Sequence, residues 1–246
     1  MSSTLILIPA HNEAGRIHRV IEGVRGSHPR ADVVVVDDGS TDETGEEARA
    51  RGARVLRHPF NLGYGASLLT GYVYAKQRGY RRVVQLDGDG QHDPSGISKL
   101  LGALDSGADV AVGSRYLAGR SPATSFGRRL GSRLFSWIVT RWTGTRITDP
   151  TSGYQAMTAT AIAELAHAGF PEDYPDADVL ITLSRAGLSL TEVSVDMRER
   201  SGGVSMHRGG RAAYYAYKML LTLSLLPVRR RSPYRAERPS SPARAG

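Results

Sequence analysis

The sequence predicts an α/β protein in which helices cover both faces of a mostly parallel sheet. Short apolar runs rich in β-branched residues alternate with longer stretches whose apolar residues recur at helical spacing. The short runs are almost continuously apolar, as in Val33-Val34-Val35-Val36, which is typical of strands buried on both faces. Polar clusters follow several of these runs, and parallel sheets bind their ligands at the carboxyl ends of the strands.

Composition narrows the class of protein. The chain has 246 residues, enough for one large α/β domain with appendages, and its 23% of charged residues indicate a globular protein. It contains no cysteine, which excludes disulfides and thiolate catalysis. The N-terminus lacks the basic segment of a signal peptide, and no stretch reaches the ~20 apolar residues of a membrane span. We therefore expect the protein on the cytoplasmic side of the membrane.

The first half of the chain reads as alternating strands and helices. Pro9 bounds the first apolar run, and the residues that follow place four apolar side chains on one helical face. Ser40 or Thr41 would cap the helix after the second strand. A glycine-rich turn at 61–67 leads into a helix that ends near Arg78. The predicted strands are residues 5–8, 33–36, 54–57, 83–86, 109–115 and 190–197.

The second half adds helices and a basic tail. The predicted helices are 97–104, 125–142, 159–168, 176–185 and 211–226, and a turn at 149–155 leads directly into the third of these. Helix 125–142 carries an apolar stripe of Phe126, Leu130, Leu134 and Ile138. We expect one domain over residues 1–206 with an interfacial helix insert at 120–146, an apolar C-terminal helix over 207–228 and a disordered basic tail over 229–246.

Two carboxylates one residue apart follow the strand at 83–86. Asp87 and Asp89, together with the amide of Gln91, offer hard oxygen ligands at the end of a buried strand. This is a partial shell that a divalent cation completes with diphosphate oxygens and water, although a solvated acidic turn is the simpler alternative. We expect His92 to orient this acidic loop (residues 87–93) rather than to act as a base.

Six motifs follow one another along residues 4–206. They are Ile8-Pro9-Ala10-His11-Asn12-Glu13, Val36-Asp37-Asp38-Gly39-Ser40, Asn61-Leu62-Gly63, Asp87-Gly88-Asp89-Gly90-Gln91-His92-Asp93-Pro94, Gly113-Ser114-Arg115-Tyr116 and Asp149-Pro150-Thr151-Ser152-Gly153-Tyr154. In this order they resemble the motifs of family 2 glycosyltransferases, and most of all those of the dolichyl- or polyprenyl-phosphate sugar synthases. The resemblance implies a GT-A fold, which is a Rossmann-like, mostly parallel sheet flanked by helices. It also implies a nucleotide-sugar donor, Mg²⁺ or Mn²⁺, and inversion at the anomeric carbon.

The resemblance also assigns roles to residues. Asp37 and Asp38 would read the base and the ribose, and the family often has tyrosine where His11 stands. The metal ligands would be Asp87, Asp89 and Gln91. The residues expected to bind the nucleotide sugar are Pro9, His11, Glu13, Asp37, Asp38, Gly63 and Asp87. The residues expected to act in catalysis are Asp89, Arg115, Arg200 and Asp178.

Cationic side chains point to a phosphate-bearing acceptor. Residues 110–148 hold seven arginines and no acid, and Arg115 follows a strand where its guanidinium can grip a phosphate with two parallel bonds. Arg200 opens a glycine-rich loop in which Met206 replaces the lysine of the family. A polyprenyl phosphate is already an oxyanion and needs no general base. If the acceptor were a hydroxyl, Asp178 would be the base, but Asp176 and Asp178 could equally cap a helix.

Two segments combine apolar, aromatic and basic residues as interfacial helices do. These are 125–142, with Trp137 and Trp142, and 214–226, which precedes three arginines; packing on the core is the alternative. We expect a peripheral protein on the inner face of the cell membrane, with a small integral-membrane partner and no nucleic acid partner. The competing functions are transfer to a hydroxyl of a polysaccharide, glycolipid or natural product, nucleotidyl transfer, and a degenerate binding module.

Overall fold

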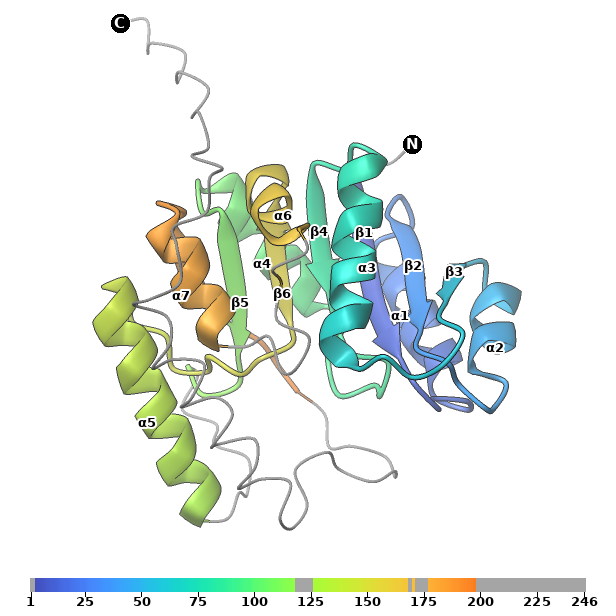
Figure 1. Cartoon of the computed structure of the whole chain (residues 1–246), viewed down its shortest axis with the longest axis horizontal. Coiled ribbons are helices and arrows are strands. Elements are labelled where there is room, and N and C mark those ends of the chain that lie inside the picture. Colours follow the sequence, from blue (N-terminus) through green and yellow to red (C-terminus); the bar gives the residue numbers. More distant parts are fainter. Residues whose placement is uncertain (1–2, 118–125, 168–169, 171–176, 198–246) are drawn as a thin grey trace, which may run out of the picture.

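The structure is a computed structural model that describes residues 3–117, 126–167, 170 and 177–197, with residues 126–133 described by their backbone only. It contains a seven-stranded sheet in the order β3-β2-β1-β4-β6-β5-β7, flanked by helices (Figure 1). All pairings are parallel except those of β6, which runs antiparallel to β4 and β5. The predicted α/β class, with its mostly parallel sheet, is therefore confirmed.

The elements alternate along the chain as the apolar pattern predicts. The strands are β1 (Thr4–Ala10), β2 (Asp32–Asp37), β3 (Arg54–Arg57), β4 (Arg82–Gln85), β5 (Val110–Ser114), β6 (Gln155–Thr158) and β7 (Leu190–Ser194). The helices are α1 (Ile17–Ser27), α2 (Thr44–Ala50), α3 (Tyr64–Gln77), α4 (Gly96–Asp105), α5 (Phe126–Thr143), α6 (Ala159–Leu165) and α7 (Ala177–Arg185). The predicted C-terminal helix over 207–228 and the tail over 229–246 lie outside the described residues.

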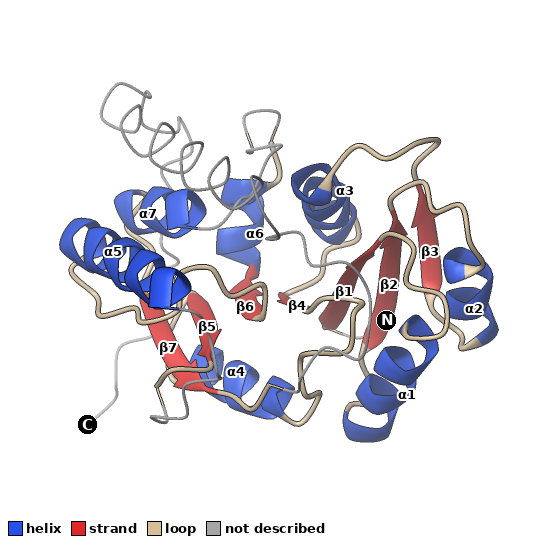
Figure 2. Cartoon of the chain, turned by 90° about the horizontal axis from the view of Figure 1, so that it is seen from below, coloured by secondary structure: helices blue, strands red, loops and turns tan. Residues whose placement is uncertain are grey.

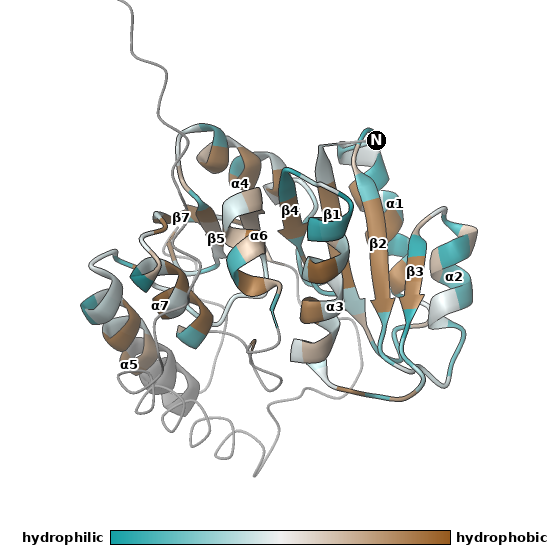
Figure 3. Cartoon of the chain, turned by 45° about the horizontal axis from the view of Figure 1, so that its top comes forward, coloured by the Kyte–Doolittle hydropathy of each residue, from teal (hydrophilic) through white to brown (hydrophobic). Residues whose placement is uncertain are grey.

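Both faces of the sheet are buried because successive side chains of a strand point to opposite sides. In β1, Leu5 and Leu7 belong to the cluster under α3, α5, α6 and α7, whereas Ile6 and Ile8 belong to the cluster under α1, α2 and α4. Figure 2 shows these two sets of helices on opposite faces of the sheet. Figure 3 shows β2 in the brown of apolar residues and α2 largely in teal and white. The core thus holds the strands rigidly, so that their ends can position a site.

Three predictions about local structure are wrong. Residues 155–158 form the antiparallel strand β6, where a turn leading into a helix was expected. Among the described side chains of α5, Phe135 and Val139 are buried and Ile138 packs partly buried against the same cluster, whereas Leu134 is 45% exposed, so this member of the predicted stripe does not face the core. At α2 the carboxylate of Asp42, not Ser40 or Thr41, accepts the Thr44 N–H at 3.1 Å.

None of the helices in residues 3–117, 126–167 and 177–197 is long and apolar enough to cross a membrane.

Candidate active site

The carboxyl ends of the parallel strands bring the predicted site residues to one edge of the sheet. Residues His11 and Glu13 follow β1, Asp38 follows β2, and Asp87 follows β4, which pairs with β1 on its other side. Gly88 packs against the end of β1, since an added Cβ would lie 3.3 Å from the Pro9 carbonyl oxygen. The acidic loop after β4 therefore lies directly beside the end of β1.

The Asp87 carboxylate is held from two sides. The Tyr64 hydroxyl, in the first turn of α3, donates to Asp87 Oδ1 at 3.0 Å. On the other side, a Cβ added to Gly153 would lie 3.0 Å from Asp87 Oδ2 and 2.8 Å from Tyr64 Oη, well inside normal contact distance. Any side chain at position 153 would therefore displace the carboxylate or the tyrosine.

His92 orients the start of the acidic loop, as predicted, through a bond to the Asp87 backbone. The ring is buried and stacks on Tyr154 with 4.9 Å between the centroids and 13° between the planes. Burial lowers the pKa of His92 to about 4, so the imidazole is neutral at pH 7. Its Nδ1 accepts the Asp87 N–H at 3.1 Å, which places the ring proton on Nε2, 3.8 Å from Asp87 Oδ2.

The donor set of the acidic loop suits a hard divalent cation. Asp89 Oδ1 accepts the Gln91 N–H at 3.0 Å, and this Asx-type turn keeps the two residues of the predicted metal set together. Among the described residues, no three histidine, aspartate or glutamate side chains are grouped as a complete metal site. The oxygens of Asp87, Asp89 and Gln91 fit a cation whose remaining ligands come from a bound diphosphate and water.

Asp37 and Asp38 hold the neighbouring loops. Asp37 is fully buried, and its Oδ1 accepts the Ser40 N–H at 2.9 Å while Oδ2 lies 3.5 Å from Arg57 Nε. Asp38 Oδ1 accepts from Leu62 N at 2.9 Å and lies 2.7 Å from His58 Nδ1. Its Oδ2 accepts from Gly63 N at 2.9 Å. Both carboxylates thus shape the walls of this edge, and their direct contact with a nucleoside stays a prediction.

The residues after β1 line the same edge. His11 is exposed, and its Nδ1 donates to the Asp38 carbonyl oxygen at 2.9 Å, which fixes the orientation of an accessible ring. Glu13 is buried and pairs with Arg16 at 2.5 Å, while its own N–H donates to Thr44 Oγ1 at 2.8 Å. Of His11 and Glu13, only His11 exposes its side chain, an aromatic ring, at this edge.

Arg115 forms the two parallel bonds that were predicted, but it forms them with a protein carboxylate. Its Nε and Nη2 donate to Asp149 Oδ2 and Oδ1 at 2.7 and 3.3 Å, and Asp149 is fully buried. Although burial works against it, the Asp149 carboxylate raises the pKa of Arg115, which keeps the guanidinium charged. In the structure, the paired bonds that we expected Arg115 to make with a phosphate are made with Asp149 instead.

A glutamate of β7 fixes the segment that carries Asp149. Glu192 Oε1 accepts the Thr148 and Asp149 N–H groups at 2.7 and 2.8 Å, and the Thr148 hydroxyl lies 3.0 Å from both Glu192 oxygens. Tyr64, Gly153, Asp149 and Glu192 support the site, but their roles come from long-range contacts. The only signal for them in the sequence is that the first three lie in or beside the motifs.

The two other predicted catalytic residues are placed differently. Asp178 is 2% exposed and lies in the first turn of α7. Because a short turn joins the end of α7 to the start of β7, this first turn faces the carboxyl edge of the sheet. Arg200, with its glycine-rich loop and Met206, lies outside the described residues.

Comparison with known proteins gives consistent results. Residues 5–165 match the family described as Glycosyl transferase family 2. The chain is 33% identical to the polyprenol monophosphomannose synthase of Mycolicibacterium smegmatis, with 88% of this chain and 85% of the relative covered. It is 31% identical to the undecaprenyl-phosphate mannosyltransferase of Micrococcus luteus, with coverages of 84% and 88%.

A solved structure supports the fold. The glucosyl-3-phosphoglycerate synthase from Mycobacterium tuberculosis, in complex with Mn²⁺, UDP and glucosyl-3-phosphoglycerate, has a TM-score of 0.66. The match covers 90% of this chain and 80% of the synthase at 21% identity, which is evidence for a shared fold.

Proposed function

Because the chain belongs to the glycosyl transferase family 2, we propose that it transfers a sugar from a GDP- or UDP-linked donor to a polyprenyl phosphate, with inversion at the anomeric carbon. The similarity to the polyprenol monophosphomannose synthase, over 88% of this chain, carries the proposal. The undecaprenyl-phosphate mannosyltransferase adds support, since its name also specifies a polyprenyl phosphate acceptor. Mannose is therefore the first sugar to test.

The nucleotide would bind at the carboxyl edge between β1 and β2. The exposed ring of His11 offers a stacking surface for the base. Asp38 holds Leu62 and Gly63 through their N–H groups, so it would keep the opposite wall of the nucleotide pocket in place. Asp37, Pro9 and Glu13 would complete this wall from the ends of the two strands.

Asp87, Asp89 and Gln91 would hold a Mg²⁺ or Mn²⁺ ion. When bound, this cation would stabilise the negative charge that develops on the leaving nucleoside diphosphate. The part played by the chain is to aim the ligands in advance: Tyr64 and His92 fix the Asp87 carboxylate and its backbone, and the missing side chain of Gly153 leaves room for it.

The acceptor would enter from the side of β5, because the segment 110–148 that begins with this strand carries seven arginines and no acid. A phosphate oxygen of the acceptor forms the new bond to the anomeric carbon as the bond to the donor diphosphate breaks, and no proton has to be removed. What the reaction needs is positive charge to bring two anions together. Arg115, kept charged by Asp149, would supply part of that charge, and Arg200 would supply more.

The lipid chain of the acceptor implies work at a membrane surface. In α5, Leu134, Trp137 and Trp142 are 45%, 66% and 45% exposed, and the exposed Arg141 lies beside them. Apolar, aromatic and basic side chains on one helix suit the headgroup region of an anionic bilayer. The peripheral location on the inner face of the membrane and a small integral-membrane partner belong to the same proposal.

A donor panel tests the reaction directly. The full chain is incubated with radiolabelled GDP- and UDP-sugars, polyprenyl phosphate and Mn²⁺, and the label in a mild-acid-labile lipid is counted. We expect one donor, GDP-mannose first, to label the lipid, and Asp89→Asn to abolish labelling. If label entered only a hydroxyl acceptor, and Asp178→Asn abolished that transfer, the polyprenyl phosphate assignment would be wrong.

A further inference from the structure

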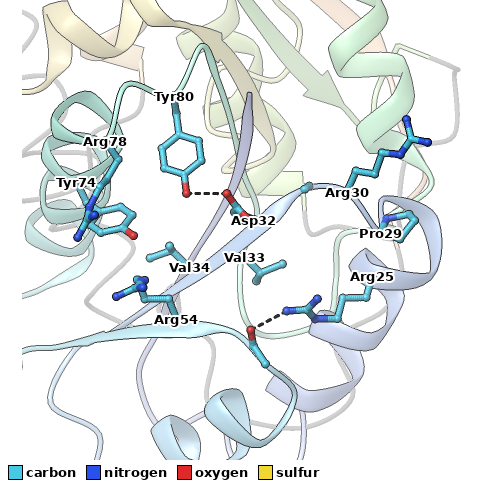
Figure 4. A pocket seen from close by; sticks show the side chains of 12 residues that line it. Arg25, Pro29, Arg30, Asp32, Val33, Val34, Arg54, Tyr74, Arg78 and Tyr80 are labelled. Atoms are coloured by element: carbon cyan, nitrogen blue, oxygen red, sulfur yellow. Dashed lines mark hydrogen bonds between the residues drawn. The ribbon is translucent and has the colours of Figure 1, made fainter. Parts of the chain in front are cut away.

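A second group of cationic side chains lies at the opposite edge of the sheet from the candidate active site. A pocket of about 370 Å³ opens between the starts of β2 and β3 and the ends of α1 and α3 (Figure 4). β2 begins at Asp32 in this pocket and ends at Asp37 in the candidate active site, about 16 Å away at the usual rise of a strand. The pocket is large enough for a small molecule and separate from the nucleotide edge.

The charge of this pocket is strongly positive. Four arginines and a single acid, Asp32, line it, a net charge of +3. The Tyr80 hydroxyl donates to Asp32 Oδ2 at 2.9 Å, as Figure 4 shows, so the one carboxylate is engaged with the tyrosine rather than with a guanidinium. Burial raises the pKa of Tyr80, which keeps its hydroxyl a donor to Asp32.

The four arginines differ in what they do. Arg25 is structural, since its Nε and Nη2 donate to the carbonyl oxygens of Arg51 and Gly52 at 2.9 and 2.7 Å. Arg78 lies over the ring of Tyr74, 5.5 Å from its centroid, so it is fixed at the wall. Figure 4 draws Arg54 on the side of the pocket that carries Tyr74, whereas Arg30 points away from Tyr80.

None of the four arginines has a carboxylate partner among the described residues, Arg25 included, since its bonds go to backbone carbonyl oxygens. In the part of the chain that the structure describes, the guanidinium groups of Arg30, Arg54 and Arg78 form no salt bridge. The positions of Arg25 in the last turn of α1 and of Arg78 at the end of α3 are explained by the attraction of a cation to the carboxyl end of a helix. It does not explain Arg54, which begins a strand, or Arg30, which lies in a loop. Like charges gathered around one cavity favour binding of an anion.

We propose that this pocket binds a soluble anion that carries two or more phosphate groups, through Arg54 and Arg78, with Arg30 at its rim. Guanidinium groups match phosphate oxygens with paired hydrogen bonds, and two phosphates balance the excess charge of the pocket. A lipid headgroup offers the same chemistry. The position at the amino edge, away from the proposed lipid acceptor, favours the soluble source.

The test uses inorganic pyrophosphate and the full chain in the presence of EDTA, so that no metal supports binding at the acidic loop. Affinity is measured by calorimetry, and the location by the backbone amide and arginine Nε–Hε signals in NMR spectra. We expect shifts at Ala31, Arg54 and Arg78. The double variant Arg54→Gln/Arg78→Gln should bind at least about tenfold more weakly, since each lost pair is a charge-assisted hydrogen bond.

Three further variants locate the effect. Arg49→Gln removes an arginine of α2 that is exposed, as Arg54 and Arg78 are, and that pairs with Glu46 outside the pocket, so it should leave the affinity unchanged. Asp89→Asn should lose sugar transfer but keep pyrophosphate binding, so failure of this site and failure of the proposed function are distinguishable. Arg54→Lys retains the charge without the fork, and should bind with an affinity between those of the wild type and the double variant.

Three results would overturn the proposal. One is undiminished affinity in a folded Arg54→Gln/Arg78→Gln variant, with folding judged from its melting curve. Another is a set of shifts confined to the acidic loop. The third is binding to vesicles of anionic phospholipid, lost in the double variant, without binding to pyrophosphate, which would identify the pocket as a lipid headgroup site.

Discussion

Gly153 is the residue against which the Asp87 carboxylate rests. A methyl group there would meet Tyr64 Oη at 2.8 Å and both Asp87 oxygens at 3.0 to 3.1 Å, so either side chain must move. We expect Gly153→Ala to lower sugar transfer by about ten- to a hundredfold, because small displacements of a catalytic group have effects of this size. Initial rates at saturating donor and Mn²⁺, together with melting curves, measure the loss of activity separately from any loss of fold.

The matched substitution is Gly102→Ala. Gly102 lies inside α4, where an added Cβ would meet nothing within 4 Å, so alanine should leave activity unchanged and raise helix stability slightly. Equal activity of Gly153→Ala and Gly102→Ala would contradict the view that the tight contact at 153 positions Asp87.

Tyr64 and Asp149 show what could not be predicted about the site. Asp87, Asp89 and Arg115 stand out because strongly apolar runs lead directly into them. Their partners do not, because each comes from another element: Tyr64 from α3, and Asp149 from the segment before β6. From the sequence, Arg115 was therefore interpreted as a cation available to a phosphate, although its guanidinium is bonded to the buried Asp149 carboxylate.

At the scale of elements, Glu192 links β7 to the segment that carries Asp149. We expect Glu192→Ala to lower the free energy of unfolding by about 1–3 kcal/mol, since the Thr148 and Asp149 N–H groups lose a charged acceptor. Glu192→Gln keeps one oxygen and should recover part of this loss. Urea unfolding measures both variants.

The control for this substitution is Glu46→Ala. The Glu46 side chain is 56% exposed and pairs with Arg49 on the surface of α2, so its loss should change stability by no more than about 0.5 kcal/mol. If Glu192→Ala were as mild as Glu46→Ala, the hydrogen bonds of Glu192 would not be holding the Asp149 segment.

Helix α5 makes the membrane proposal testable. Trp137 is 66% exposed, so Trp137→Ser should leave stability unchanged but weaken binding to anionic vesicles by roughly tenfold, as a large apolar side chain no longer enters the lipid. Trp137→Phe should retain most of the binding. Flotation with vesicles measures all three proteins, and equal flotation of Trp137→Ser and wild type would exclude this face of α5 as a lipid contact.

The elements that could be predicted are those whose local pattern is unambiguous. β1, β2 and β4 were predicted within two residues because their apolar runs are continuous and both faces are buried. β6 has four residues and owes its strand conformation to pairing with β4 and β5 on either side, which no local pattern reveals. In α5 the inward residues depend on contact with α7, so the apolar pattern alone could not show that Leu134 does not face the core.

At the scale of the whole molecule, one sheet separates the two sites that we propose for phosphate groups. Under the proposed function, the acidic loop at the carboxyl edge would need a cation to accept a diphosphate, whereas the arginine pocket at the amino edge carries its own positive charge. Both edges are fixed to the same strands, and β2 runs from one to the other. Diphosphate ligands should therefore bind this glycosyltransferase in two ways that differ in their need for metal.

Thermal unfolding separates the two. A nucleoside diphosphate with Mn²⁺ at about a hundred times its Kd should raise the Tm by roughly 5–10 °C, because ligand binding to the folded state alone adds about 2.7 kcal/mol. Most of this rise should be lost in Asp89→Asn, whose arginine pocket is intact, and the rise should persist in Arg54→Gln/Arg78→Gln, whichever of GDP and UDP produces it. When EDTA removes the Mn²⁺, the smaller rise in Tm that the nucleoside diphosphate still causes should depend on the arginines instead. It should be absent in Arg54→Gln/Arg78→Gln and present in Asp89→Asn. An equal rise with and without Mn²⁺ in the arginine variant would mean that the acidic loop binds the nucleotide without a cation.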